Sequence, residues 1–190
     1  MRTHYGMDNL PEIVVPVVTI GSFDGVHRGH VALLQSVIDE ASRIGGSSVV
    51  ITFSPHPRQV LGGAAEDFRL LTTLEEKIEH LAQLGIDELI VVEFTRQFAS
   101  LSSEEFVRDY LVARLGMKSL VVGYNHRFGH DRNLPSNHFE LLGNKYGFEV
   151  VRAGALTNDG AKISSTVIRS LIAEERIAEA EELLGHKFTL

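Results

Sequence analysis

The sequence predicts an α/β fold: a parallel five-stranded sheet with helices on both faces, then a small C-terminal hairpin and two short helices. One observation is a series of short apolar runs, rich in β-branched residues, that lack the alternation of strands with one wet face. Another is that the amphipathic stretches before these runs end at glycine, which readily closes a helix in the left-handed conformation. Strands and helices thus alternate, which favours a parallel sheet.

The elements follow one another in a regular order. The predicted strands are residues 14–20, 48–53, 88–93, 120–123 and 148–152. The predicted helices between them are residues 31–44, 74–84, 106–115 and 139–146, which precede Gly45, Gly85, Gly116 and Gly147. The turn signal Asn158-Asp159-Gly160 predicts a hairpin between residues 150–156 and 162–163. Short helices are predicted over residues 166–173 and 176–184.

The composition suits a single domain. A chain of 190 residues, 44% hydrophobic and 23% charged, can bury a core without disulfides or a structural metal. The absence of cysteine excludes thiolate zinc sites, iron–sulfur clusters and cysteine nucleophiles. The 18 basic residues against 25 acidic ones argue against a duplex-binding surface. Since no signal peptide or membrane span is evident, we expect a cytoplasmic protein that binds neither nucleic acid nor membranes.

Residues 21–30, after the first predicted strand, have the composition of a phosphate-binding loop. Three glycines allow the backbone to approach a ligand closely: Gly21, Gly25 and Gly29. His27 and His30 are three residues apart, so they lie on one face at the start of a helix, where anions are favoured. A lone histidine at a helix start is more often a surface residue, and a metal pair is a lesser alternative because Asp24 is the one further ligand nearby. Neither a Walker loop nor a dinucleotide-binding glycine pattern is present.

The loop Gly-x-Phe-Asp-Gly-x-His-x-Gly-His resembles the signature of nucleotidyltransferases related to class I aminoacyl-tRNA synthetases. Its form here is similar to the FAD synthetase (FMN adenylyltransferase) domain of bacterial bifunctional riboflavin kinase/FAD synthetases. Further blocks resemble that family in its own order, from about residue 13 to residue 188: residues 52–58, 71–77, 94–98 with 105–106, 123–129 and 163–169. The resemblance implies one Rossmann-like nucleotidyltransferase domain over residues 1–190. In this family ATP and FMN react, with Mg²⁺, to give FAD and pyrophosphate.

The resemblance also implies roles for individual residues. The catalytic residues would be His27, His30 and Arg169, which hold phosphates and stabilise the departing pyrophosphate. The ATP-binding residues would be Gly21, Phe23, Asp24, Gly29, Asn125, Ser164, Ser165 and Thr166. The FMN-binding residues would be Phe53, His56, Pro57 and Phe128. No protein metal ligand is expected, because Mg²⁺ relies largely on water and substrate phosphates, although Asp24 is a candidate to orient a histidine or help place the ion.

Simpler roles stay open for several of these residues. Ser164 can be a plain helix cap, the prolines around His56 can form a rigid turn, and Phe53 can be a core residue. His126 departs from the phenylalanine common in the family, which puts one flavin contact in doubt.

The riboflavin kinase domain of full-length relatives is not found in this sequence, so we expect FAD synthesis without riboflavin phosphorylation. Two alternatives remain. One is a related transferase that acts on phosphopantetheine, a nicotinamide nucleotide or glycerol phosphate. The other is a flavin-nucleotide binding module without turnover. The blocks at residues 55–57 and 123–129 favour FMN as the substrate.

Overall fold

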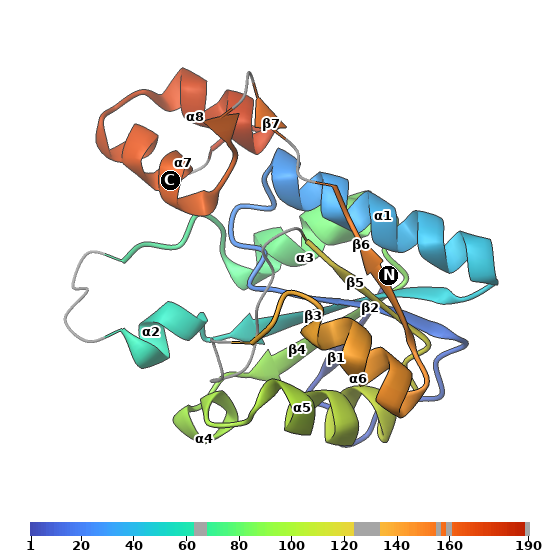
Figure 1. The fold of residues 1–190 in the computed structure, drawn as a ribbon. Helices are drawn as coiled ribbons and strands as arrows, with labels where there is room; N and C mark the ends of the chain where they lie inside the picture. Colours follow the sequence, from blue (N-terminus) through green and yellow to red (C-terminus); the bar gives the residue numbers. More distant parts are fainter. Residues whose placement is uncertain (63–67, 124–133, 155–156, 159–160, 189–190) are drawn as a thin grey trace.

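The computed structural model describes residues 1–62, 68–123, 134–154, 157–158 and 161–188. A parallel six-stranded sheet forms its centre, in the order β1-β4-β3-β2-β5-β6 (Figure 1). The strands are β1 (Arg2–Tyr5), β2 (Pro16–Ile20), β3 (Ser47–Ser54), β4 (Glu88–Glu93), β5 (Ser119–Val122) and β6 (Glu149–Arg152). The α/β class and the parallel sheet are therefore confirmed.

The predicted number of strands is wrong by one, because β1 was not expected. Its sequence, Arg-Thr-His-Tyr, lacks the apolar character of the other strands, and it forms an edge of the sheet, where charged side chains are common. It is held by tertiary contacts: Arg2 Nε and His4 Nε2 both lie 2.7 Å from carboxylate oxygens of the buried Glu88. A four-residue strand stabilised in this way leaves no periodic signal in the sequence.

Helices cover both faces of the sheet, as predicted (Figure 1). One face carries α1 (Arg28–Ile44) and α3 (Leu74–Gln83), and the other carries α5 (Ser103–Glu105), the π-helix η1 (Phe106–Val112) and α6 (His138–Tyr146). Neighbouring residues of β3 point to opposite layers: Val50 packs with Leu34 and Leu81, while Ile51 packs with Leu111. The α-helix predicted over residues 106–115 is wrong in two respects: the segment is a π-helix, and it ends at Val112.

Two short helices occupy connections that the sequence predicts to be loops. They are α2 (Pro57–Leu61), which follows β3, and α4 (Arg96–Ala99), which follows β4. Each starts at a side-chain cap, His56 for α2 and Thr95 for α4. Helices of five and four residues are too short to show an amphipathic period, which explains why they were not predicted.

The two predicted C-terminal helices are confirmed, and a hairpin precedes them, but its first strand begins at Thr157 rather than within the predicted residues 150–156. Strands β7 (Thr157–Asn158) and β8 (Ala161–Lys162) pair antiparallel, and α7 (Ser165–Ala173) and α8 (Ile177–Leu184) follow. The two helices share a small core with Leu71, from the loop before α3. In Figure 1 they lie beside the start of α1, at the edge where the strands end. Among the described residues, no helix is both long and apolar enough to cross a membrane.

Candidate active site

The loop between β2 and α1 has an unusual backbone. Phe23, Gly25 and Val26 have φ angles of 46°, 82° and 35°, in the region that side chains other than glycine rarely adopt. Phe23 and Val26 tolerate this because both side chains are buried in the core beneath α1. At position 25 a Cβ atom would lie 2.8 Å from Leu71 Cδ1, so both the φ angle and the available space require glycine. The loop is thereby held in one conformation.

Phe23 and the glycines at 21 and 29 shape the surroundings of the histidines. The Phe23 ring is almost completely buried and meets the edge of the His30 ring at a centroid distance of 5.2 Å. A Cβ at Gly21 would lie 3.0 Å from the Phe23 ring, and a Cβ at Gly29 would lie 3.2 Å from the His27 ring. All three residues therefore support the positions of the two imidazoles, and their predicted contacts with ATP stay predictions.

His27 and His30 are stacked at the N-terminus of α1. Their ring centroids are 3.6 Å apart, and His27 caps the helix by accepting a hydrogen bond from the His30 backbone N–H at its Nδ1 atom, over 3.2 Å. Burial lowers the pKa of His27 to about 4, and burial together with the neighbouring His27 lowers the pKa of His30 well below its usual value. Both rings are therefore neutral at pH 7. Since Nδ1 of His27 is the acceptor, its proton is on Nε2, which can donate to a ligand.

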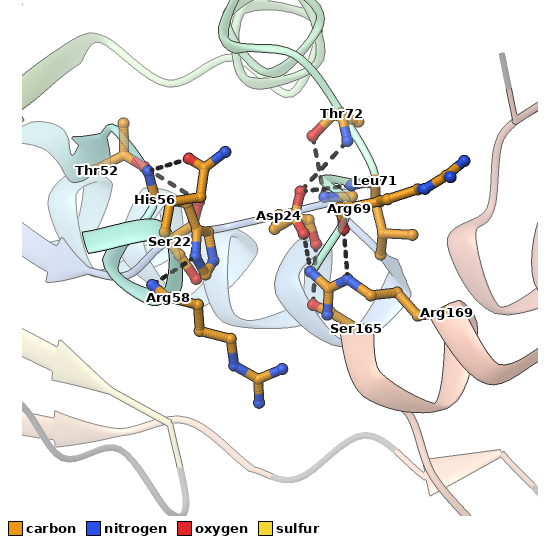
Figure 2. Close-up of polar contacts among 12 residues, drawn as sticks. Ser22, Asp24, Thr52, His56, Arg58, Arg69, Leu71, Thr72, Ser165 and Arg169 are labelled. Atoms are coloured by element: carbon orange, nitrogen blue, oxygen red, sulfur yellow. Dashed lines mark hydrogen bonds and ion pairs between the residues drawn. The ribbon is translucent and has the colours of Figure 1, made fainter. Parts of the chain in front are cut away.

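Asp24 joins this loop to two distant segments (Figure 2). One carboxylate oxygen, Oδ1, accepts hydrogen bonds from the backbone N–H groups of Leu71 and Thr72, at 2.9 and 3.3 Å. The other, Oδ2, forms an ion pair with the Arg169 guanidinium. The Asp24 side chain is 1% exposed. Within the described part of the chain, Asp24 has no hydrogen bond to either histidine, so its carboxylate positions Arg169 rather than an imidazole.

Arg169 is fixed on three sides by Asp24, a carbonyl and an aromatic ring. Its Nε atom donates to the Arg69 carbonyl oxygen over 2.8 Å, and its guanidinium lies 4.5 Å from the centroid of the Phe68 ring. The same ring lies 4.8 Å from the His56 ring and 5.6 Å from the Arg58 guanidinium. Phe68 thus links the C-terminal helix α7 to the segment after β3. The sequence analysis missed Phe68, and a single phenylalanine in a connection offers no pattern that indicates such a role.

The start of α7 lies against the histidine loop. Ser165 Oγ donates to the backbone carbonyl oxygen of Asp24 over 3.0 Å, and a Cβ at Gly29 would lie 3.7 Å from the Ile163 carbonyl oxygen. Ser164 caps α7 by accepting from the Val167 N–H over 3.3 Å, as the simpler interpretation expected, and Thr166 is exposed. The predicted N-terminal and C-terminal anion-binding segments therefore meet.

The residues predicted to bind FMN divide into three groups. His56 caps α2, with Nδ1 accepting from the Arg58 N–H over 3.1 Å, and Pro57 occupies the first helical position. Burial lowers the pKa of His56 to about 4. Phe53 packs against Phe94 at a ring-centroid distance of 5.3 Å and adjoins the core on the α5 side, as the core interpretation expected. Phe128 lies outside the described residues, as do Asn125, which was predicted to bind ATP, and the divergent His126.

A buried lysine is the second residue that the sequence analysis did not assign to the site. Lys77 is 5% exposed, and its ammonium nitrogen lies 3.4 Å from Thr52 Oγ1. A signal for it exists in the sequence, because Lys77 occupies the apolar stripe of α3 between Leu74 and Leu81. A charged residue on a face that packs against a sheet is unusual and marks a position for inspection.

The sequence was compared with protein families and with curated proteins. The family model for FAD synthetase matches residues 12–167. The bifunctional riboflavin kinase/FMN adenylyltransferase of Escherichia coli K12 is 40% identical over 174 residues, covering 92% of this chain and 55% of that protein. The protein of the same name from Listeria monocytogenes is 40% identical, covering 91% and 54%. The chain thus spans about half the length of these relatives.

Solved structures extend the comparison to the fold. A Streptococcus pneumoniae structure described as a macrolide-efflux protein superposes with a TM-score of 0.86 at 30% identity, over 98% of this chain and 62% of that one. Pantothenate synthetase from Thermus thermophilus has a TM-score of 0.55 at 17% identity, over 97% of this chain and 81% of that one, which is a likeness of fold alone. Because the FAD synthetase model covers the histidine loop and most of the segment before Arg169, the chain belongs to the FAD synthetase family.

Proposed function

We propose that the chain transfers the adenylyl group of ATP to FMN, giving FAD and pyrophosphate. The observation that carries this proposal is the junction of two phosphate-binding segments through Asp24: the histidine loop of α1 and the start of α7 with Arg169. Family membership and the names of the curated relatives support FMN as the acceptor.

The proposed reaction is a direct displacement. An oxygen of the FMN phosphate attacks the α-phosphorus of ATP, the bond from that phosphorus to the bridging oxygen breaks, and pyrophosphate leaves with the electron pair. A phosphate monoester is largely dianionic at pH 7, so the nucleophile needs no general base. The protein then contributes position and charge stabilisation. Histidines with lowered pKa values suit this role, since they are weak bases but still donate N–H hydrogen bonds.

The free donors of the site fit phosphate oxygens. In the described part of the chain, Arg169 uses Nε and Nη2 for Arg69 and Asp24, which leaves Nη1 for a ligand. His27 offers Nε2, and the absence of a Cβ at Gly29 lets a phosphate approach the N-terminus of α1. These donors would hold the ATP phosphates and the charge that develops on pyrophosphate.

Mg²⁺ is proposed to arrive with ATP. No group of three or more His, Asp or Glu side chains that could hold a metal ion occurs among the described residues, and both Asp24 oxygens already have partners. Mg²⁺ commonly keeps several waters and binds substrate phosphates, so these residues fit an ion carried by the nucleotide. When bound, it would neutralise phosphate charge.

The test is to incubate the protein with FMN, ATP and Mg²⁺ and to measure FAD and pyrophosphate in parallel, with FMN omitted as a control. Equal amounts of both products are expected. Replacing His30 or Arg169 by alanine should lower kcat by ~100-fold or more, whereas R176A, in an exposed ion pair of α8, should not. FMN binding without turnover, or turnover only with another phosphorylated acceptor, would contradict the proposal.

A further inference from the structure

Among the described residues, Lys77 is a buried cation without a carboxylate partner. Its side chain extends from α3 and is 5% exposed, and Nζ has one long hydrogen bond, 3.4 Å, to Thr52 Oγ1. Thr52 is itself fully buried and donates to the Ser22 carbonyl oxygen over 3.2 Å. In the part of the chain that the structure describes, no ion pair includes Lys77. Lysine is almost never buried to this extent unless it is paired.

A purely structural role explains this arrangement poorly. The aliphatic part of a lysine can cover apolar surface, but the ammonium normally reaches water, and here it ends on a buried hydroxyl. Burial lowers the pKa of Lys77, so the free protein holds the charge at a cost. Leucine or methionine would fill the same space in the stripe of α3 without that cost. Nothing in the described part of the chain accounts for the charge, which points to a ligand.

The groups that sense this charge are those of the candidate site. The positive charge of Lys77 helps to lower the pKa of His30 and of His56, and the Asp24 carboxylate acts on Lys77 in the opposite direction. Lys77 thus lies within electrostatic range of both the histidine loop and the segment after β3. Asp24 already pairs with Arg169, so among the described residues one carboxylate acts on two cations.

We propose that Lys77 binds the phosphate oxygens of the substrates at the place where the histidine loop and His56 face the same ligand. The inference rests on the proposed function for the identity of these phosphates, because the histidine loop is assigned to ATP and His56 to FMN. Lys77 stabilises the negative charge around the α-phosphorus during transfer and exchanges no proton. It is thus a catalytic residue by charge, and the ligand supplies a counter-ion that the described residues do not provide.

The variant K77M tests this, because methionine keeps the length and removes the charge. Inorganic tripolyphosphate, added without nucleotide or flavin, should raise the unfolding temperature of the wild-type protein. In K77M its apparent Kd should be at least ~10-fold weaker and kcat for FAD formation ~100-fold lower, while the unfolding temperature without ligand should stay equal or rise. K77R should recover part of the tripolyphosphate binding. The matched control is K118M, at an exposed lysine just before β5.

The outcomes separate this inference from the proposed function. If K77M binds tripolyphosphate and makes FAD as the wild type does, the inference is wrong and the proposed function stands. If the wild type makes no FAD, but tripolyphosphate binding still depends on residue 77, the phosphate site stands and the proposed reaction fails. If K77M does not fold, the comparison uses K77R and K77Q, and unchanged tripolyphosphate affinity in K77Q would overturn the inference.

Discussion

Breaking the ion pair between Asp24 and Arg169 should destabilise the protein and also slow FAD formation, and the two effects can be measured separately. The Asp24 side chain is 1% exposed and that of Arg169 is 19% exposed, so removal of one partner leaves the other charge largely out of water. Such losses cost about 3–5 kcal/mol, and the partial exposure of Arg169 places D24N and R169M near the lower end, about 3 kcal/mol each. For a chain of this size that lowers the unfolding temperature by about 6–12 °C.

The double variant D24N/R169M distinguishes coupling from independent damage. Because it removes both charges together, its loss should be about 3–4 kcal/mol rather than the sum of the single losses, a coupling of about 2–3 kcal/mol. Urea unfolding followed by circular dichroism measures all four proteins, with E179Q in an exposed pair as a control that should cost less than about 0.5 kcal/mol. FAD formation should stay at least ~100-fold lower in the double variant. Additive stability losses would refute the coupling.

Three further predictions follow from the same structure. The folded pKa of His27, about 4, lies below its unfolded value of 6.5, so stability should be full above pH 6.5 and fall by about 3 kcal/mol as pH drops towards 4. In H27N, the free energy of unfolding measured in urea should depend less on pH between 6.5 and 4. An unchanged dependence would contradict the lowered pKa of His27. G25A should lower stability by more than about 2 kcal/mol because of its φ angle and crowding, whereas G154A, in open space, should not, as thermal unfolding would show. E88Q should loosen β1, and an unchanged rate of proteolysis at the N-terminus would oppose this.

The fold was predictable where helices stop at glycine and strands are uniformly apolar. Gly45 and Gly147 adopt the left-handed conformation at the ends of α1 and α6, so the residue type reports the local backbone directly. Two features that were not predicted, β1 and the π-helix, are not marked by any residue within their own segment. β1 depends on Glu88, more than eighty positions away, and the π-helical hydrogen bonding of Phe106–Val112 is not encoded in an amphipathic period.

The sequence predicted many of the residues that form the candidate site, but not their protonation states or ion pairs. The spacing of His27 and His30 and the serines before Arg169 indicated two anion-binding segments. The spacing of the histidines does not fix their protonation, and in the folded protein burial lowers the pKa of both and keeps them neutral. The sequence likewise could not show that Asp24 pairs with Arg169, since that contact exists only after α7 packs on the loop. A sequence motif can thus indicate that a residue binds phosphate, but its protonation state depends on how deeply the fold buries it.

In the proposed site, two neutral histidines together with the charged Arg169 and Lys77 would bind two anions, the phosphates of ATP and FMN. Each further buried positive charge would destabilise the free protein, and among the described residues Asp24 is the carboxylate that acts on both Arg169 and Lys77. Keeping the imidazoles neutral limits that cost while retaining their directional N–H donors. The phosphates then supply the missing negative charges, so ligand binding should stabilise the folded protein by more than contact area alone implies. Because the positive charges of the site are balanced only in part before the substrates bind, we expect the complex with both substrates to be favoured.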